Sequence, residues 1–446
     1  MCSIFGIIRL GDNYPMNFRT DFNHLMTCST IRGRDGWGFA RIPNEGSPTF
    51  YRSNKRWADY NPDPWFRFLI GNCRAEPTTE WVENKQPEDQ QPYALDDWII
   101  VHNGTVANDS ELRDHTLRTE IDSAAIVEYL NKTMATNLHD LLNVTVGSYA
   151  ILAVHLPTMR LHVACNYRPI WVSRTNDRIY FGSNREFIPR EGIGAAPEMM
   201  QPYSYSIFDV DGNMIQTMDL LPFTLEKRAL VICSSGLDST VAAQACKNRG
   251  DDVTLLHFRY GSRAEGRELT AIRMIAEEMK VPLVVKALPI YDAEDSNLLN
   301  PVCDIAGGEK GAEFAHEWVP ARNLVMLAIA TAYAEAKGFD IIVLGNNLEE
   351  AGAYPDNEPE FIDKFNDLLP FAVGDKKRVR VEMPVGNMMK HEIVEYGLRI
   401  KAPLHLTWSC YKNGSLHCGV CGPCYMRRKA FEINQVEEVI EYASEH

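Results

Sequence analysis

The chain has 446 residues, of which 45% are hydrophobic and 24% are charged, as is typical of a globular protein with two or three domains. No segment reaches the roughly 18 uncharged apolar residues that a membrane helix needs, and the N-terminus lacks the basic start of a secretory signal, so we expect a cytoplasmic protein without membrane contacts. The formal net charge of −15 favours small-molecule substrates, because nucleic-acid binding needs a basic surface.

Residues 1 to about 225 are rich in predicted strands. Short apolar or alternating runs predict strands at 98–102, 149–155 and 178–182, and apolar positions at helical spacing predict a helix at 123–132. A turn at 211–213 joins two late strands, and residues 220–224 are interpreted as a linker.

After Lys227 strands and helices alternate. Strands are predicted at 229–233, 253–258, 282–287 and 341–344, and helices at 238–249, 267–280 and 323–337. This alternation implies a parallel sheet with helices on both faces. We therefore expect an α/β protein with two domains, at 1–225 and 226–446. Two basic runs, at 376–380 and 427–429, are expected to be solvated surface.

Cys2 directly follows the initiator methionine. If that methionine is removed, the thiol lies beside an α-amine with a pKa of about 7.7–8.0, which can accept the thiol proton. A nucleophile and its base would then share one residue. From Cys2 alone, a buried structural cysteine is an equal interpretation.

Four further segments accompany Cys2, namely a glycine-rich turn at 32–38, Asn72-Cys-Arg-Ala75, His102-Asn-Gly-Thr105 after a predicted strand, and Glu120-Ile-Asp-Ser123 before the predicted helix. In this order they resemble the class II glutamine amidotransferases. The resemblance covers most of residues 1–220 and implies an N-terminal-nucleophile hydrolase fold, an αββα sandwich.

The resemblance also implies a role for each residue. Cys2 would attack the side-chain amide of glutamine and form a thioester. The Asn103 side chain and the Gly104 backbone N–H would form the oxyanion hole, Arg74 would pair with the α-carboxylate of glutamine, and Asp122 would bind its α-ammonium group. Without the resemblance, Arg74 and Asp122 would be read as ordinary ion-pair residues.

A loop of small residues lies between the predicted strand at 229–233 and the next helix. Its members are Ser234, Ser235, Gly236, Leu237, Asp238, Ser239 and Thr240. Such a loop at a helix N-terminus presents backbone N–H groups to an anion, and it lacks the Gly-Lys pair of a P-loop. It resembles the pyrophosphate loop of N-type ATP pyrophosphatases, usually Ser-Gly-Gly-x-Asp-Ser, which implies ATP binding with Asp238 linked to magnesium. The alternative is a simple turn with Asp238 near the helix cap.

Residues 228–434 resemble the 7-cyano-7-deazaguanine synthase family. The segments that carry the resemblance are Tyr260-Gly-Ser-Arg263, Val319-Pro-Ala-Arg-Asn323, Leu344-Gly-Asn-Asn347, Tyr354-Pro-Asp356 and the cysteine-rich stretch 409–431. The resemblance implies that Arg322, Asn323, Tyr354 and Asp356 bind the 7-deazaguanine substrate. Asn357 and Glu358 stand where Cys-Arg is common.

Four cysteines, Cys410, Cys418, Cys421 and Cys424, lie within fifteen positions. Four thiolates at this spacing suit a closed, structural zinc site. An iron–sulfur cluster is the alternative, and His417 is a competing ligand. The isolated cysteines are expected to be reduced, small core residues; they are Cys28, Cys73, Cys165, Cys233, Cys246 and Cys303.

The two halves together resemble proteins in which a glutamine amidotransferase is fused to a 7-cyano-7-deazaguanine synthase. This implies that ammonia released from glutamine at Cys2 passes to a site that uses ATP with magnesium and converts 7-carboxy-7-deazaguanine to its amide and then to 7-cyano-7-deazaguanine. The fusion has a physical reason, because free ammonia at neutral pH is mostly ammonium and not nucleophilic. A homo-oligomer is also expected.

Three other functions stay open. One is addition of ammonia to the cyano group to give the formamidine of archaeosine, on a free base or a nucleic acid, which needs no ATP. The others are an amide ligase like asparagine synthetase, which has the same two-part plan, and transfer of the deazaguanine to a protein amine. The ATP loop and the complete Cys2 set favour the synthase, and the acidic charge disfavours a nucleic-acid or protein acceptor.

Overall fold

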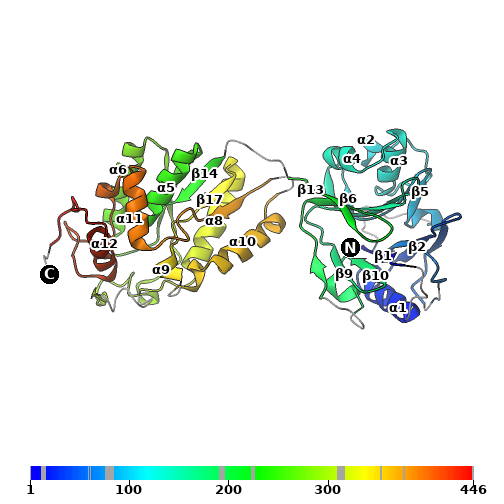
Figure 1. Ribbon diagram of the computed structural model, residues 1–446, viewed down its shortest axis with the longest axis horizontal. Coiled ribbons are helices and arrows are strands. Elements are labelled where there is room, and N and C mark those ends of the chain that lie inside the picture. Colours follow the sequence, from blue (N-terminus) through cyan, green and yellow to red (C-terminus); the bar gives the residue numbers. More distant parts are fainter. Residues whose placement is uncertain are drawn as a thin grey trace. The chain divides into compact units, whose positions relative to one another are not determined.

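The computed structural model describes residues 2–11, 17–58, 60, 62–75, 85–189, 196–221, 227–308, 317–351, 354–374 and 377–443. The chain forms two compact units, Met1–Leu221 and Pro222–His446 (Figure 1). Most of the predicted linker at 220–224 lies outside the described residues. None of the described helices is both long and apolar enough to cross a membrane.

The N-terminal unit contains two sheets in which all paired strands run antiparallel. The first sheet has the order β11 (Glu198–Met199), β9 (Trp171–Arg174), β10 (Arg178–Gly182), β1 (Ser3–Arg9), β4 (Phe68–Arg74), β2 (Gly36–Ile42), β3 (Thr49–Ser53). The second has the order β13 (Met214–Asp219), β12 (Ser204–Phe208), β8 (Arg160–Cys165), β7 (Gly147–His155), β6 (Trp98–Val106), β5 (Tyr93–Leu95).

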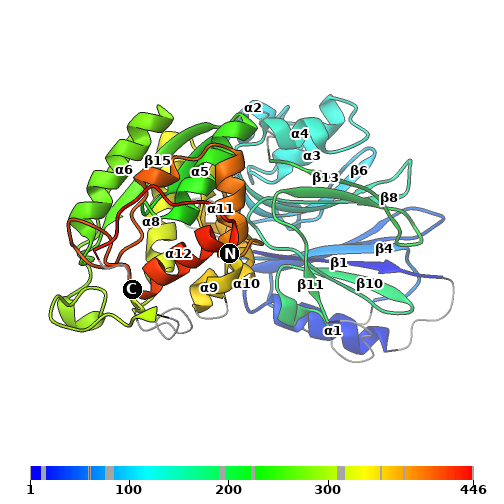
Figure 2. The same cartoon turned by 60° about the vertical axis from the view of Figure 1, so that its left-hand side comes forward.

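These sheets stack face to face, and helices cover both outer faces (Figure 2). Apolar side chains of β1 and β4 pack against those of β6, β7 and β8 between the sheets. Helix α1 (Phe18–Ser29) covers the first sheet. The second sheet is covered by α3 (Ala124–Lys132), whose apolar positions face the strands, together with the short helices α2 (Asp109–Leu112) and α4 (His139–Val144).

The C-terminal unit is built on one parallel sheet with the order β16 (Leu283–Ala287), β15 (Asp252–Arg259), β14 (Arg228–Ile232), β17 (Ile341–Val343), β18 (Arg380–Glu382). Both faces of β14 are buried. Ala229 and Val231 pack toward α5 (Leu237–Arg249), α6 (Glu265–Met279), α11 (Lys390–Arg399) and α12 (Gly422–Ile433). Leu230 and Ile232 pack toward α8 (Arg322–Lys337) and α10 (Pro359–Ala372) on the opposite face.

The order of this sheet also fixes where a site can form. From β14 the chain first adds β15 and β16 on one side, and it later adds β17 and β18 on the other side. The direction in which strands are added to the sheet therefore reverses at β14. In an open parallel sheet, ligands bind at such a switch point, beyond the carboxyl ends of the strands.

Most predicted elements are confirmed within one to three residues, including the helix that ends at Gly250, which has φ +98°. One boundary was wrong. The strand predicted at 98–102 continues to Val106, so Asn103 and Gly104 lie inside β6 and do not follow it. The sequence analysis did not predict the three-residue strand β18 or the helices α10, α11 and α12.

Candidate functional site

Cys2 lies at the start of β1, beside the end of β4. Because Ser3 pairs with Cys73 in this sheet, the next position of β4, Arg74, comes close to Cys2. The Cys2 thiol is half-buried and donates a hydrogen bond to the carbonyl of Ala75, at 3.4 Å. The pairing of β1 with β4 therefore brings together two residues that are 72 positions apart in the sequence.

Two side chains link this strand end to the second sheet. The Asn72 amide donates to the carbonyls of Ser3, at 3.1 Å, and His102, at 3.4 Å. The Ser183 hydroxyl accepts from the backbone N–H of Ile4, at 2.9 Å, and from the side chain of Asn103, at 3.4 Å. These bonds hold the Asn103 amide near the start of β1. The sequence analysis assigned no role to Asn72 or Ser183, and nothing in the pattern around Ser183 indicated one.

Gly104 follows Asn103 on β6 and faces Tyr149 of β7. A β-carbon at this position would lie 1.8 Å from the carbonyl oxygen of Ser148. Any side chain would therefore collide with the backbone of β7, and only glycine allows the strands to pair here.

Arg74 and Asp122 are both buried and both lie within electrostatic reach of Tyr93. One guanidinium nitrogen of Arg74 donates to the carbonyl of Asp89, at 2.9 Å. The Asp122 carboxylate accepts from the backbone N–H of Val106, at 2.6 Å, and from the Ser123 hydroxyl, at 3.0 Å. The fold thus brings a cation and an anion close to one buried tyrosine. Arg74 ends a strand of the first sheet, whereas Asp122 lies just before α3, which covers the second sheet.

In the C-terminal unit the loop at 234–240 lies where β14 ends and α5 begins. Ser235, which stands where the related loops have their first glycine, has φ +74°, so this serine adopts the left-handed conformation that glycine favours. Its side chain is fully buried, and its carbonyl accepts a hydrogen bond from the backbone of Trp408, at 2.9 Å. The loop therefore keeps the backbone conformation that glycine would favour at this position, although the residue is serine.

Asp238, on the first turn of α5, is held from two directions. Its carboxylate is 2.5 Å from the Lys390 ammonium group and accepts from the Asn347 amide, at 3.2 Å. Both side chains of the ion pair are largely buried, at 12% and 14% exposure. Lys390 begins α11, about 150 residues away, and the sequence analysis missed it. It adds a positive charge beside the loop, which suits the binding of phosphate.

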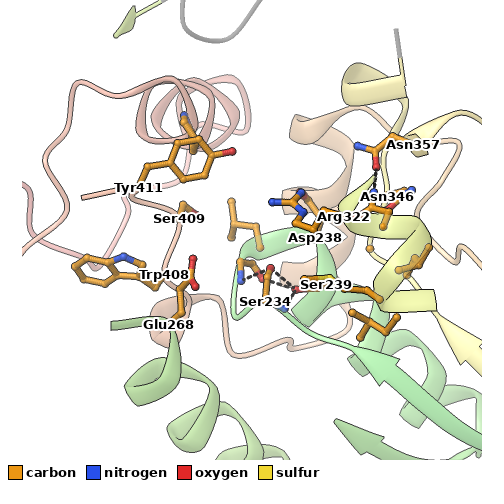
Figure 3. A pocket seen from close by; sticks show the side chains of 18 of the residues that line it. Ser234, Asp238, Ser239, Glu268, Arg322, Asn346, Asn357, Trp408, Ser409 and Tyr411 are labelled. Carbon is orange, nitrogen blue, oxygen red and sulfur yellow. Dashed lines mark hydrogen bonds between the residues drawn. The ribbon is translucent and has the colours of Figure 1, made fainter. Parts of the chain in front are cut away.

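The loop forms one wall of a pocket at the carboxyl ends of the strands (Figure 3). The empty space of the pocket, including the part open to solvent, is about 1070 Å³. Its main polar and aromatic walls are Ser234, Asp238, Ser239, Tyr260, Glu268, Arg322, Asn323, Asn346, Asn357, Lys390, Trp408, Ser409, Tyr411 and Arg427.

The four residues predicted to bind the base divide between two cavities. Arg322 and Asn323 open α8 and line the main pocket, where Arg322 donates to the Tyr260 hydroxyl, at 3.2 Å. Tyr354 and Asp356 line a smaller adjoining cavity that shares Arg322 with the main one.

Asp356 also has a structural role at the start of α8. Its carboxylate accepts from the backbone N–H of Asn323, at 3.2 Å, and burial raises its pKa above the ordinary value. The Asn323 amide donates to the side chain of Asn357, at 2.7 Å. Asn357, which replaces the common cysteine, is therefore fixed at the wall of the main pocket.

Glu268 is a pocket residue that the sequence analysis missed. It lies on the first turn of α6 and is half-buried, and the Ser262 hydroxyl donates to its carboxylate, at 2.8 Å. Burial raises the pKa of Glu268 to about 7. The only sequence signal was its place on the helix that follows Tyr260-Gly-Ser-Arg263.

The four cysteines of the C-terminal cluster converge, with all four sulfur atoms within 4.8 Å of one another. The Cys418–Cys424 and Cys410–Cys421 sulfur pairs are each 4.0 Å apart. Four sulfurs about 2.3 Å from a tetrahedral zinc ion would lie about 3.8 Å apart, so the cluster has the size that such an ion needs.

His417 does not belong to this cluster. Its Nε2 atom accepts a hydrogen bond from the backbone N–H of Ser409, at 3.1 Å, and its ring packs on Trp408, with centroids 4.2 Å apart. Burial lowers the pKa of His417 to about 4, so the ring is neutral and its role is packing.

Two further expectations from the sequence need correction. Arg427 is 1% exposed, not solvated, because it donates to the Thr407 hydroxyl, the Leu404 carbonyl and the Glu438 carboxylate. Of the isolated cysteines, Cys28 and Cys303 are only half-buried, whereas the other four are core residues.

Family comparisons match each half of the chain. The family described as queuosine biosynthesis protein QueC matches residues 228–435. The family described as glutamine amidotransferase domain matches residues 79–190.

Individual relatives match the chain at full length or over half of it. A Sulfolobus acidocaldarius protein named 7-cyano-7-deazaguanine synthase is 40% identical over 465 residues, covering 99% of this chain and 100% of the relative. 7-Cyano-7-deazaguanine synthase 2 of Sulfurisphaera tokodaii is 41% identical over 462 residues, with 99% and 100% coverage. A Methanothrix thermoacetophila 7-cyano-7-deazaguanine synthase is 43% identical over 221 residues, which is 98% of that protein and 48% of this chain.

Proposed function

This chain belongs to the family of 7-cyano-7-deazaguanine synthases that carry a glutamine amidotransferase domain, and we propose that it converts 7-carboxy-7-deazaguanine to 7-cyano-7-deazaguanine with glutamine as nitrogen donor and ATP as energy source. We assign glutamine hydrolysis to the N-terminal unit and the ATP-dependent steps to the C-terminal unit. The observation that carries the second assignment is the single pocket that joins the loop around Asp238 to Arg322, Glu268 and Trp408.

In the N-terminal unit, Cys2 is the proposed nucleophile. Its thiolate attacks the side-chain carbonyl of glutamine, and the amide nitrogen leaves as ammonia once it is protonated. Water then hydrolyses the thioester and releases glutamate. The Asn103 side chain, held near the start of β1 through Ser183, and the backbone N–H of Gly104 stabilise the oxyanion. Arg74 and Asp122 bind the α-carboxylate and the α-ammonium group.

In the C-terminal unit, ATP binds with its phosphates on residues 234–240, beside Lys390. Asp238 would hold magnesium, which would neutralise negative charge on the phosphates. The substrate carboxylate attacks the α-phosphate, and pyrophosphate leaves. Ammonia then displaces AMP to give the amide. A second ATP adenylates the amide oxygen with release of pyrophosphate, and loss of two protons and AMP gives the nitrile. Each of the two oxygens removed from the carboxylate therefore leaves on an AMP.

Activation is required because a carboxylate is a poor electrophile and hydroxide is a poor leaving group. Arg322 contributes a fixed positive charge in the pocket, where it can orient the carboxylate. We assign Cys410, Cys418, Cys421 and Cys424 to a structural zinc ion, whose contribution is to fold the segment that carries Trp408, Ser409 and Tyr411.

The test uses two variants of the full chain. Cys2→Ala is expected to abolish synthesis with glutamine and to retain it with ammonium, and Asp238→Ala is expected to abolish synthesis with either donor while glutamine hydrolysis continues. Product is measured by mass spectrometry with amide-labelled glutamine. Formation of a formamidine from 7-cyano-7-deazaguanine without ATP, undiminished in Asp238→Ala, would replace the synthase by the amidinating reaction.

A further inference from the structure

We propose that Glu268 recognises the guanine-like edge of the base, with its ionised carboxylate accepting hydrogen bonds from the N1–H and the exocyclic 2-amino group. The inference deepens the proposed function, on which it rests for the identity of the base. Glu268 would determine the specificity for the base, and the base would bind at a different place from the adenine of ATP.

The position of Glu268 first supports this role. It lines the main pocket together with Tyr260, Trp408 and Arg322. Its Oε2 atom accepts from Ser262, at 2.8 Å, so the carboxylate is held in place. Among the described residues no cation lies within ion-pairing distance of it, in contrast to Glu265 of the same helix, which is 2.8 Å from Arg259. A carboxylate that faces a pocket in this way can accept hydrogen bonds from a ligand.

An aromatic surface lies next to this carboxylate. Figure 3 shows Glu268 and Trp408 on one side of the pocket, with Asn346 and Asn357 on the other. The guanidinium of Arg267, the residue before Glu268, lies 5.7 Å from the centre of the Trp408 ring. Trp408 is fixed because its indole N–H donates to the carbonyl of Cys410, at 2.8 Å. The His417 ring also packs on Trp408, with centroids 4.2 Å apart, so Trp408 is a fixed aromatic wall beside the Glu268 carboxylate. A fixed aromatic wall beside a polar group suits a flat heterocycle with one hydrogen-bonding edge.

The chemistry of that edge distinguishes two kinds of base. A guanine-like edge presents two adjacent N–H donors, which match the two acceptor oxygens of an ionised carboxylate. Adenine presents an acceptor, N1, beside a single amino donor, so an ionised carboxylate would face a lone pair. Glu268 therefore fits the deazaguanine and not the adenine of ATP, unless the carboxyl group is protonated.

The pH dependence separates these two cases. The groups that face Glu268 are Arg322 of α8, Tyr260 after β15, Ser262 before α6, and Glu265 on its own helix. Burial raises the pKa of Glu268 to about 7, although Ser262 and Arg322 act in the opposite direction. A base with two donors binds the ionised form, so its affinity should increase as the pH rises from 6 to 8. An adenine that needs the protonated form should show the reverse.

The experiment measures equilibrium binding and does not depend on turnover. Dissociation constants of 7-deazaguanine and of 7-deazahypoxanthine, which lacks the 2-amino group, are measured by calorimetry for the wild-type chain and for Glu268→Gln. We expect the wild type to prefer 7-deazaguanine by about 10- to 100-fold, as for hydrogen bonds to a charged group. Glu268→Gln should reduce this preference to about threefold or less and leave ATP binding unchanged. Glu277→Gln, an exposed carboxylate on the same helix, is the matched control and should behave as the wild type.

Two results would overturn the inference. One is an equal preference for 7-deazaguanine in the wild type and in Glu268→Gln. The other is a loss of ATP affinity in that variant with no change in base affinity, which would assign Glu268 to the adenine. If the wild type binds 7-deazaguanine selectively through Glu268 but does not convert the carboxylate, the proposed reaction fails while this inference stands.

Discussion

Gly345 is a position where a single added methyl group should damage the proposed ATP site. It follows β17, and a β-carbon built there would lie 2.5 Å from both the N and Cα atoms of Ser239. Ser239 belongs to the first turn of α5, directly after Asp238. Because the colliding atoms are backbone, no side-chain rotation relieves the contact, so Gly345→Ala must push α5 and β17 apart.

The size of the effect follows from this distance. Ordinary van der Waals contact begins near 3.4 Å, so the backbones must separate by about 1 Å. Forcing a methyl group into a packed site costs about 1–3 kcal/mol of the free energy of unfolding. A 1 Å displacement of residues that position a substrate can reduce the rate by about 100-fold. We therefore expect the KM for ATP to increase and kcat/KM for ATP to fall by about 10- to 100-fold.

The assay is AMP release at varied ATP with ammonium as nitrogen donor, with glutamine hydrolysis as an internal control that should not change. Gly266→Ala is the matched variant, because its β-carbon would have only one neighbour, the side-chain oxygen of Asn413, at 3.9 Å. It is the second residue of α6, so alanine should leave the stability unchanged or raise it by up to about 0.5 kcal/mol. A Gly345→Ala protein with kcat/KM for ATP within twofold of the wild type would refute the reasoning.

Three further predictions concern stability. Elemental analysis should find one zinc ion per wild-type chain and much less in Cys418→Ser. The substitution should also lower the free energy of unfolding of the C-terminal unit by about 4 kcal/mol or more. A stable wild-type preparation that contains iron or no metal would contradict this. Arg427→Met should cost about 3–5 kcal/mol in urea unfolding, because it leaves the Glu438 carboxylate buried, at 10% exposure, without its cation; a loss under 1 kcal/mol would be inconsistent with that role. Burial lowers the pKa of His162, which contacts the Tyr205 hydroxyl at 2.6 Å, to about 3. In the unfolded chain the pKa of this histidine is about 6.5, so between pH 6.5 and pH 3 the unfolded chain binds a proton that the folded chain does not. The free energy of unfolding should therefore fall as the pH drops through this range. His162→Gln should make the free energy of unfolding depend less on pH there.

Much of the local structure, and the residue types of both proposed sites, could be predicted from the amino-acid sequence. The apolar runs identified the three inner strands of the parallel sheet, β15, β14 and β17, because a strand covered on both faces needs apolar side chains throughout. The spacing of the four cysteines identified the cluster whose sulfur atoms converge, since all four lie in one short segment. The loop at 234–240 was recognisable because its small residues are contiguous.

The tertiary structure decided what distant segments contribute. Lys390 reaches Asp238, and Ser183 reaches Asn103, only through the pairing of strands and the packing of helices, and neither contact leaves a periodic trace in the sequence. Arg427 is charged and lies in a basic run, so sequence alone suggested a surface. Its burial depends on the Leu404 carbonyl, the Ser409 hydroxyl and the Glu438 carboxylate. Sequence patterns reflect contacts between residues that are close in the chain. The charged and hydrogen-bonding partners of a site come from distant segments, and which of these segments meet is determined only when the chain folds.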